Sequence, residues 1–483
     1  MRRVLPTVTF ADLILHHALT QPEKPAMVLP DRVVTYGMVA QGMLRIERRV
    51  RALALKPGAL LCITIESPIR HMIVAAALFR LGHPTMSASR ATDVVPLGLP
   101  IAAFFEAPGA LLIPGQRHVV VTDDWFDGDA LPLPPRPVGG FADDQSICRV
   151  ELSSGTTGRP KSTSLTLAAL NQWLVNYSHS VGQGHWDRLL SLPGLTNSWG
   201  FTLAAHALFA GKTVFFADTP RGTLQMVALY GVEMLVASSQ QLRELVREQT
   251  EAPIPCPSLR AVMTGGSLMS QALMAEARAK LCSNLISQYG STEAGATAFA
   301  TADRLAGTEG ATGFVAPWAM VEAVDEDNRP LPPDTEGILR IRATCQGAAY
   351  PPGRQDADSS FRDGWFYPGD CGRVRADGLL IVTGRTSEII NVGGLKVAPE
   401  IVEDIVRPHP AVLEAAALGV RGAGGIEEIV LAVVPRGPLN ERQLINWCAE
   451  RNIPVARVVS VEGLPKTTLG KINRELLKAR LTG

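Results

Sequence analysis

Between about residues 59 and 288, short apolar runs alternate along the chain with longer stretches in which apolar residues recur at helical spacing. The short runs have the length of buried strands, and the longer stretches have the spacing of helices that cover a sheet. The paired runs and stretches are 59–66 with 71–81, 187–192 with 201–210, and 213–217 with 222–231. This alternation predicts β–α units and largely parallel sheets.

Two segments depart from this alternation. Residues 83–146 carry a proline-rich run and repeated glycines, and they predict a loop-rich connection with one strand, at 118–122. After about residue 310, apolar runs are punctuated by Gly, Pro and Asp. This second pattern predicts a small β-rich subdomain.

The pattern changes again near Gly384 and Arg385, after which about 100 residues alternate strands with helices. The strands are expected at 414–420 and 427–434, and the helices at 398–406 and 441–450. The fold class is therefore expected to be α/β, with βα-layered parallel sheets and the β-rich subdomain in a large N-terminal domain, followed by a small mobile α+β domain. The predicted domains are residues 1–384 and residues 385–483.

The composition is that of a globular protein, with 46% of the 483 residues apolar and 19% charged. The 46 basic residues balance the 46 acidic ones, so the net charge does not indicate a nucleic-acid partner or an acidic membrane surface. The seven cysteines are odd in number and never closer than 26 residues, which argues against a disulfide framework and indicates a reducing cytoplasm. No run reaches the roughly 18 apolar residues of a membrane helix, so no membrane span is expected.

The most specific local motif is SSGTTGRPKS, from Ser153 to Ser162. It follows a strand-like run at 148–152 and precedes a helical stretch at 165–175. Its glycines allow close backbone approach, its hydroxyls donate hydrogen bonds and Lys161 supplies charge, which together suit an anion. The spacing differs from the G-x-x-x-x-G-K-[ST] of an ordinary P-loop. A polar turn between a strand and a helix is the alternative.

Further motifs follow in a fixed order: TGGSL (264–268), QYGSTEAG (288–295), DGWFYPGD (363–370), GRTSEIINVGGLKVAPEIVE (384–403) and LPKTTLGKINR (464–474). In this order and spacing the chain resembles the adenylate-forming superfamily of acyl-CoA synthetases, aryl-acid ligases, peptide-synthetase adenylation domains and firefly luciferase. It is closest in pattern to a stand-alone acyl- or aryl-acid CoA ligase. The resemblance covers nearly the whole chain, and two of only nine lysines, Lys161 and Lys471, fall where the family has lysines.

The resemblance implies an AMP-forming acid–thiol ligase in which the large domain, residues 1–384, binds ATP and the acid. Such enzymes join a carboxylate to the α-phosphate of ATP, release pyrophosphate, and pass the acyl group to a pantetheine thiol on coenzyme A or on a carrier protein. One anion must attack another while a third leaves, so positive charge and Mg²⁺ are required. The implied cofactors are ATP and Mg²⁺, and the implied catalytic residues are Lys471, Thr292, Glu293 and Arg385.

Each implied catalytic residue has an expected role. Lys471 enters the site during adenylation and contacts the substrate carboxylate and the α-phosphate, although a surface lysine is usually only solvated. Thr292 donates to the α-phosphate. Glu293 is a suitable Mg²⁺ ligand, with a solvated loop carboxylate as the alternative. Arg385 contacts ribose or phosphate, with a plain interdomain salt bridge as the alternative.

For the nucleotide, the resemblance implies that Gly265, Gly266 and Ser267 leave a flat slot for adenine. Tyr289 stacks on the adenine unless it is a core tyrosine, and Asp370 accepts the ribose hydroxyls unless it only stabilises a turn. The implied nucleotide-binding residues are Ser153, Ser154, Gly155, Thr156, Thr157, Gly158, Lys161, Gly265, Gly266, Ser267, Gln288, Tyr289, Gly290, Ser291, Thr292, Asp370, Arg385 and Lys471.

The acyl pocket, the hinge and the pantetheine path are also implied. The acyl pocket is expected at Asn197, Trp199, Gly265, Gly290 and Ala296. Asn197 stands where many members carry His or an aromatic residue, so the pocket is expected to differ. Ser387 is the expected hinge, and Gly393 and Gly394 are the expected pantetheine face, which implies that the small domain rotates between the two half-reactions.

Several alternatives stay open. The acid is aromatic or aliphatic, and the acceptor is coenzyme A or an acyl or peptidyl carrier protein. A stand-alone adenylation domain for an amino acid or an unusual acid is a second possibility, although no acidic residue between Leu189 and Asp218 is present to pair with an ammonium group. A luciferase-like oxygenase is a third. A non-catalytic nucleotide-binding homologue is disfavoured because the charged motif residues are all present.

Overall fold

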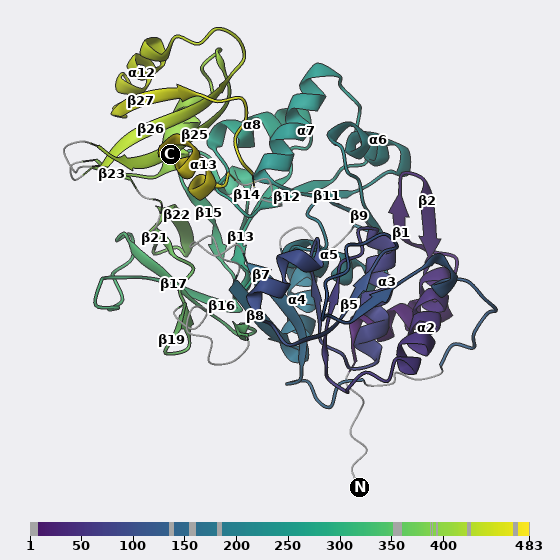
Figure 1. Cartoon of the computed structure of the whole chain (residues 1–483). Coiled ribbons are helices and arrows are strands. Elements are labelled where there is room, and N and C mark those ends of the chain that lie inside the picture. Colours follow the sequence, from purple (N-terminus) through teal and green to yellow (C-terminus); the bar gives the residue numbers. More distant parts are fainter. Residues whose placement is uncertain are drawn as a thin grey trace.

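The computed structural model of the chain describes residues 8–134, 140–153, 161–180, 186–350, 360–386, 388, 390–392, 395–422, 427–466 and 472–482. Figure 1 shows a large body that contains the purple and teal parts of the chain. A smaller yellow-green body at the C-terminal end lies against it, beside α8 and β22.

The larger sheet has fifteen strands among the described residues, and its central part is parallel. In spatial order these parallel strands are β13 (Leu285–Ser291), β12 (Ala261–Gly265), β11 (Met234–Ser238), β9 (Arg188–Ser191), β10 (Thr213–Phe215) and β1 (Pro25–Leu29). The antiparallel strand β2 (Arg32–Thr35) pairs with β1. These strands are short and mostly apolar because helices cover both faces of a parallel sheet.

Beyond β13 the same sheet becomes antiparallel. The strands are β14 (Gly295–Thr301), β15 (Ala311–Val315), β22 (Leu379–Arg385), β21 (Asp370–Val374), β17 (Gly337–Ala343), β16 (Ala319–Val324), β20 (Trp365–Phe366) and β19 (Phe361–Arg362). They enclose an apolar cluster that includes Val321, Leu339 and Leu380. The prediction of a β-rich subdomain is confirmed, and the β13–β14 pairing makes it continuous with the parallel sheet.

The second sheet has seven strands within the described residues, in the order β18 (Ala348–Ala349), β8 (Lys161–Thr166), β7 (Ile147–Ser153), β4 (Thr85–Ser87), β3 (Leu60–Ile63), β5 (Ile101–Glu106) and β6 (His118–Val120). The prediction of a single strand in 83–146 is therefore wrong, because β4 and β5 also lie there. β4 has three residues, too few for a readable pattern. β5 ends at the buried Glu106, which binds the His118 ring across 2.6 Å.

Helices lie between the two sheets and on the outer face of the larger sheet. One core cluster joins residues of α1, α2, α3, α4 and α5 to both sheets, and another joins α6, α7 and α8 to the opposite face of the larger sheet. Their bounds are α1 (Phe10–Thr20), α2 (Tyr36–Ala52), α3 (Pro68–Arg80), α4 (Leu167–His179), α5 (Ser198–Phe209), α6 (Pro220–Tyr230), α7 (Ser239–Glu251), α8 (Gln271–Lys280) and α9 (Ala302–Leu305), with 3₁₀ turns at Ala91–Asp93, Val95–Leu97 and Asp123–Trp125. Among the described residues, no helix has the length and apolar character needed to cross a bilayer.

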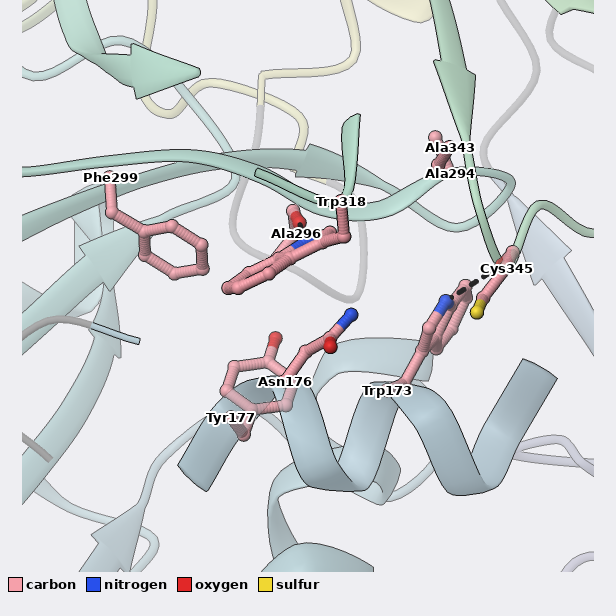
Figure 2. Close-up of a pocket in the computed structure, with 9 residues that line it drawn as sticks. All are labelled: Trp173, Asn176, Tyr177, Ala294, Ala296, Phe299, Trp318, Ala343 and Cys345. Carbon is pink, nitrogen blue, oxygen red and sulfur yellow. Dashed lines mark hydrogen bonds between the residues drawn. The ribbon is translucent and has the colours of Figure 1, made fainter. Parts of the chain in front are cut away.

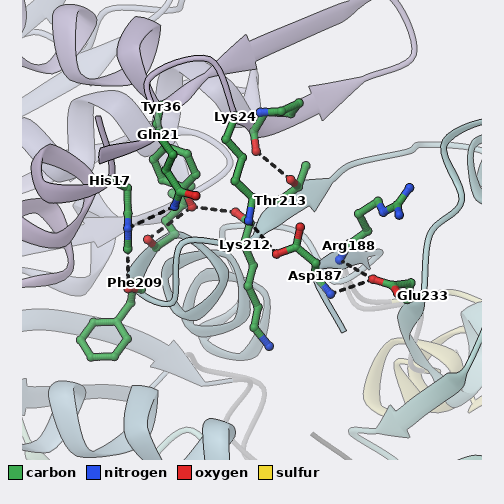
Figure 3. A network of polar contacts seen from close by, with 12 residues as sticks. His17, Gln21, Lys24, Tyr36, Asp187, Arg188, Phe209, Lys212, Thr213 and Glu233 are labelled. Atoms are coloured by element: carbon green, nitrogen blue, oxygen red, sulfur yellow. Dashed lines mark hydrogen bonds and ion pairs between the residues drawn. The ribbon is translucent and has the colours of Figure 1, made fainter. Parts of the chain in front are cut away.

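Polar contacts tie the N-terminal segment to the larger sheet (Figure 3). The hydroxyl of the buried Tyr36 donates to the carbonyl of Lys212 over 2.6 Å. His17 bonds the carbonyl of Phe209 at 3.0 Å, and Lys24 forms an ion pair with Asp187 at 2.7 Å. These contacts hold the segment that contains α1 and α2 against the end of α5 and the residues just before β9 and β10.

The C-terminal part has its own core. Its elements are β23 (Ile390–Val392), β24 (Leu395–Val397), α11 (Pro399–Val406), β25 (Val412–Arg421), β26 (Glu427–Pro435), α12 (Glu441–Ala449), β27 (Val455–Ser460) and α13 (Arg474–Thr482). The central core cluster of this part, which includes Val402, Leu431 and Leu444, contains no described residue before Ile390. The predicted strands and helices of this region match β25, β26, α11 and α12.

Candidate active site

A cleft of about 1440 Å³ lies between the large body and the small C-terminal part. Its lining includes residues from both sides, such as Gln288 and Arg385 from the large body and Glu403 and Arg474 from the small part. The cleft also collects residues predicted from separate motifs: Lys161, Asn197, Trp199, Gly265, Gly266, Ser267, Gln288, Tyr289, Gly290, Ser291, Thr292, Glu293, Ala296, Asp370 and Arg385. Segments more than 200 residues apart in the sequence therefore meet in one place.

Some predicted residues lie outside the described part of the chain. They are Ser154, Gly155, Thr156, Thr157, Gly158, Ser387, Gly393, Gly394 and Lys471. Ser153 is described only as the backbone end of β7. The roles assigned to these residues stay predictions.

The glycine-rich segment does not lead directly from a strand into a helix. β7 pairs antiparallel with β8, and Ser153 is opposite Lys161 across the ladder. Thr166 then caps α4 by accepting from the backbone of Ala169. The expected helical stretch from residue 165 therefore begins two residues later, at Leu167, because residues 161–166 form a strand in which small polar and β-branched side chains pack between neighbours. The Lys161 ammonium group donates to Ser360 at 2.8 Å.

Gly265 ends β12 in a crowded position. A Cβ atom there would lie 2.7 Å from the carbonyl oxygen of Gln288 and 3.4 Å from the Trp199 ring. Gly266 follows with a φ of +83°, which favours glycine. Position 265 thus excludes a side chain, and both Gly265 and Gly266 line the cleft.

The hairpin between β13 and β14 presents Glu293 to the cleft. The Ser291 hydroxyl accepts from the backbone of Ala294 at 3.0 Å, and the backbone of Gly347 donates to the Glu293 carbonyl at 2.7 Å. Glu293 has an exposed fraction of 7%, which does not fit the alternative of a solvated loop carboxylate. The turn is held from both sides, so the carboxylate has a defined position.

Tyr289, Asp370 and Arg385 form a linked group. The Tyr289 hydroxyl donates to one carboxylate oxygen of Asp370 at 2.6 Å, and Arg385 Nε lies 3.3 Å from the other. Asp370 and Arg385 are opposite each other in β21 and β22. Burial, and then the charge and hydrogen bond of Asp370, raise the pKa of Tyr289, which stays a hydrogen-bond donor. The described ion pair of Arg385 is thus with the neighbouring strand and not with the small domain.

Asn197 is a helix cap. Its side-chain oxygen accepts from the backbone of Trp199 at 2.8 Å and of Gly200 at 3.4 Å, at the start of α5. This interaction satisfies two amide groups that a helix otherwise leaves unpaired. Trp199, in contrast, has no capping role and its ring packs beside Gly265.

Aromatic residues that the motifs did not reveal line the inner end of the cleft and a small adjoining niche. Figure 2 shows Trp173, Asn176 and Tyr177 rising from α4 toward Trp318, Ala296 and Phe299. The indole N–H groups of Trp173 and Trp318 donate to the carbonyls of Cys345 and Ala296 at 2.9 and 2.8 Å. In the sequence these residues have only the apolar periodicity of core positions, so no local signal separates them from ordinary core residues.

Two family models match the chain. Residues 114–350 match the AMP-binding enzyme family, and residues 401–471 match the AMP-binding enzyme C-terminal domain. An indoleacetate–CoA ligase of Aromatoleum aromaticum is 30% identical over 363 residues, which cover 72% of this chain and 69% of that protein. The chain therefore belongs to the AMP-binding enzyme family, and the resemblance predicted from the motifs is confirmed. The predicted enzyme class, an AMP-forming acid–thiol ligase, is confirmed by membership of this family and by its acid–CoA ligase relatives.

A further relative and two solved structures are also similar to this chain. A 3-hydroxybenzoate–CoA ligase of an Aromatoleum species is 27% identical over 401 residues, or 78% of this chain and 75% of that protein. The o-succinylbenzoate CoA synthetase of Bacillus subtilis, solved with its acyl-adenylate intermediate, has a TM-score of 0.85 at 21% identity, covering 97% of this chain and 98% of that one. An amide bond synthetase of Marinactinospora thermotolerans has a TM-score of 0.83 at 21% identity, covering 98% of this chain and 99% of that one. The predicted fold class is thereby confirmed.

Proposed function

We propose that this enzyme uses ATP to convert a carboxylic acid into an acyl-adenylate with release of pyrophosphate, and then transfers the acyl group to the thiol of coenzyme A. The observation that carries the proposal is the single cleft that gathers the described parts of the motifs. The curated relatives named above, which are CoA ligases, support coenzyme A as the acceptor.

The cleft suits the electrostatic problem of adenylation. Lys161 and Arg385 bring positive charge to it, and charge placed in advance is the main source of stabilisation when anions react. Asp370 presents carboxylate oxygens for the ribose hydroxyls and is itself oriented by Tyr289 and Arg385. Thr292 lines the cleft beside Glu293 and can donate to a phosphate oxygen.

The residues present fit a magnesium ion that is held mainly by the nucleotide. Glu293 is a buried carboxylate at the cleft, and the described residues contain no cluster of three or more His, Cys, Asp or Glu that could cage a metal. Mg²⁺ prefers one or two carboxylates together with phosphate oxygens and water. Glu293 would hold the ion, which would neutralise the charge of the phosphates.

We also propose that the enzyme has two domains that move relative to each other. We place the boundary near 384/385, where β22 ends at Arg385, the pivot at Ser387 and the pantetheine path at Gly393 and Gly394. The separate core of the C-terminal part supports this division. A carrier protein as the acceptor stays a prediction. A cytoplasmic location, favoured by the odd number and wide spacing of the cysteines, also stays a prediction.

The test is carboxylate-dependent exchange of pyrophosphate into ATP across an acid library, followed by detection of thioesters with coenzyme A and, separately, with a carrier protein. We expect exchange with at least one acid and thioester formation with coenzyme A. Absence of exchange with every acid would favour the non-catalytic alternative. Thioesters on the carrier protein alone would correct the acceptor.

A further inference from the structure

A group of buried polar atoms lies at the inner end of the cleft, among aromatic walls. Trp199 Nε1, Thr202 Oγ1 and Gln288 Oε1 are shielded from water and have no hydrogen-bond partner among the described residues. All three residues line the cleft, together with Trp173 and Tyr177. Polar atoms buried without a partner are rare in folded proteins and call for an explanation.

These atoms converge on the hydroxyl of Tyr177. Gln288 Nε2 donates to that hydroxyl at 3.1 Å, and exchanging the amide oxygen and nitrogen of Gln288 would still leave one end unpaired. The Trp199 N–H lies near the same hydroxyl without reaching hydrogen-bond geometry. Burial raises the pKa of Tyr177, so the hydroxyl keeps its proton as a donor.

Thr202 lies on the α5 face that packs on α4. It is one turn after Trp199 and one turn before His206, whose ring lies 6.0 Å from the Tyr177 ring. A buried threonine in a helix commonly bonds the carbonyl four residues earlier, as Thr223 of α6 does with Thr219 at 2.8 Å. The Thr202 hydroxyl makes no such bond and is 2% exposed. It is therefore available to a group that enters from the cleft.

The side chains that line this end are neutral, and the Lys212 ammonium group acts from behind them on His206. The described residues at this end, Trp173, Tyr177, Trp199, Thr202 and Gln288, carry no charge. Behind them, His206 Nδ1 donates to the Leu174 carbonyl, and burial lowers the pKa of His206 to about 4, so this ring is also neutral near pH 7. A charged group on the substrate would have no counter-charge among these lining side chains, whereas a neutral hydroxyl or N–H would have partners.

The walls favour a flat ring. Trp173 packs so closely on Gly295 that a Cβ atom there would lie 2.8 Å from the indole, and Trp199 lies against the bare backbone of Gly265. The N–H of Trp173 is tied to the Cys345 carbonyl, which holds that wall in place. Rigid aromatic surfaces accept planar rings better than flexible alkyl chains.

We propose that the acid activated in this cleft is an aromatic carboxylic acid that carries a neutral hydrogen-bonding group, such as a ring hydroxyl or ring N–H, and that Tyr177, Trp199, Thr202 and Gln288 pair with this group. This inference rests on the proposed function. An alkyl chain in the same place would leave the polar atoms unpaired. Sites built to bond a hydroxyl reject analogues without it far more strongly than apolar pockets discriminate between hydrocarbons.

The test compares acids with purified full-length enzyme, ATP, Mg²⁺ and coenzyme A. The acids are benzoate, its three monohydroxy derivatives, indole-3-acetate and octanoate, and the readout is kcat/KM from pyrophosphate release. We expect at least one hydroxylated or N–H-bearing acid to exceed both benzoate and octanoate by about tenfold or more. Octanoate or benzoate as the best acid would overturn the inference but leave the proposed function intact. Activity with none of these acids and none in a wider library would overturn both.

The variant Thr202→Val removes the hydroxyl at nearly constant volume, and Thr202→Ser keeps it. We expect Thr202→Val to lower kcat/KM for the preferred acid about 10- to 100-fold while the value for benzoate changes less than threefold, and Thr202→Ser to keep most of the preference. Thr223→Val is the matched control, because Thr223 is a buried helical threonine away from the cleft. If Thr202→Val does not fold, Trp199→Phe, which keeps a ring and removes the N–H, replaces it. The expected result is then a fall in the ratio of kcat/KM for the preferred acid to kcat/KM for benzoate, because Trp199 is also a wall of the pocket. Equal loss with all acids in these variants would show that the atoms are structural.

Discussion

Position 265 has room for glycine but not for a side chain. The strand β12 ends there against the backbone of Gln288 and beside the ring of Trp199, and both neighbours line the cleft. A single carbon atom at this position would contact main chain, which has little freedom to move away. The contact between the motifs at 264–268 and 288–295 thus requires glycine at position 265, because even the methyl group of alanine would collide with Gln288.

Gly265→Ala is expected to displace β12 from β13 and to raise the KM for ATP about tenfold, because overpacking against backbone typically costs about 1–3 kcal/mol. Steady-state kinetics with varied ATP measure this effect. Gly437→Ala is the control, since a Cβ atom at Gly437 would meet nothing within 4 Å. An unchanged KM for ATP in Gly265→Ala would show that β12 and β13 accommodate the extra methyl group without disturbing the nucleotide site.

Lys471 lies outside the described residues, and its role is predicted from its motif. Lys471→Ala is expected to slow adenylation by a factor of about 10² to 10³, the usual effect of removing one charge placed to stabilise a transition state. Thioester formation from a supplied acyl-adenylate is expected to be spared. Single-turnover assays of the two steps check this, with the exposed Lys56→Ala as control. Equal loss in both steps would contradict the role.

At the scale of elements, α5 connects fold and site. Most of its residues are buried, so the helix is fixed by packing on all sides. Its first turn faces the cleft, where Asn197 caps it and Trp199 forms a wall. The sequence pattern assigned both residues to the acyl pocket, whereas the structure gives Asn197 a direct role in holding the helix.

Asn197→Ala is expected to lower the free energy of unfolding by about 0.5–2 kcal/mol, because two amide groups lose their acceptor. Asn197→Ser, which can still cap, is expected to retain most of the stability. Thermal unfolding of the three proteins measures this. If both variants are as stable as the unsubstituted enzyme while the ranking of acids changes, Asn197 acts on the substrate and not on the helix.

Three elements of the small domain meet at Arg474. Its guanidinium group lies 3.0 Å from Glu388 in the linker and 3.1 and 2.8 Å from Glu400 and Glu403 in α11. Glu403 also accepts from the backbone of Ala417 in β25. Burial outweighs the attraction of Arg474 and raises the pKa of Glu403 to about 7. This carboxyl group therefore holds a proton at pH values where it would be ionised in the unfolded chain.

The folded state then binds more protons than the unfolded state between about pH 4.5 and pH 7, so the contribution of Glu403 to stability is largest at the acid end and falls as the pH rises. Glu403→Gln is expected to remove this dependence. Thermal unfolding midpoints at pH 5 and pH 7.5 check the effect. Between these two pH values the midpoint of the unsubstituted enzyme is expected to fall more than that of Glu403→Gln. Parallel pH profiles of the two proteins would contradict the raised pKa.

At the scale of the whole molecule, the cleft exists because two bodies with separate cores are joined by one short linker. The contacts described between them are sparse and polar, such as Arg407 with Ser270 at 3.4 Å. Interfaces of this kind permit relative motion of domains. The position of the linker, between the end of β22 and the start of β23, fits a pivot at or near Ser387.

Ser387→Pro is expected to trap the enzyme in one arrangement, because proline fixes φ near −65° and removes a backbone donor. We expect adenylation to survive better than thioester formation, so that acyl-adenylate accumulates on the enzyme. Single-turnover measurement of both steps decides this. If both rates match those of the unsubstituted enzyme, the pivot lies elsewhere or the small domain does not rotate.

Local pattern was sufficient for much of the fold. The alternation of short and long apolar runs predicted the β–α units around β3, β9 and β10, and the strands and helices of the small domain, because each such element buries one face and shows it as a period. It failed at β4, β5 and β8. β5 ends in a charged residue, Glu106, that the fold buries against His118. β4 is too short to show a period, and β8 carries small polar residues whose burial depends on neighbours from other parts of the chain.

For the site, the sequence by itself determined the chemistry and the tertiary structure decided the shape. Motifs with glycine, hydroxyl and charged residues in fixed order predicted Lys161, Glu293 and Asp370 as nucleotide-site residues, and the fold brings all three to one cleft. The aromatic walls and the unpaired atom of Thr202 carry no such local signal. They become a pocket only when α4, α5 and β13 pack together. The same residue type lines a core or a pocket depending on whether other side chains or an open cleft face it, and the local sequence does not record this difference.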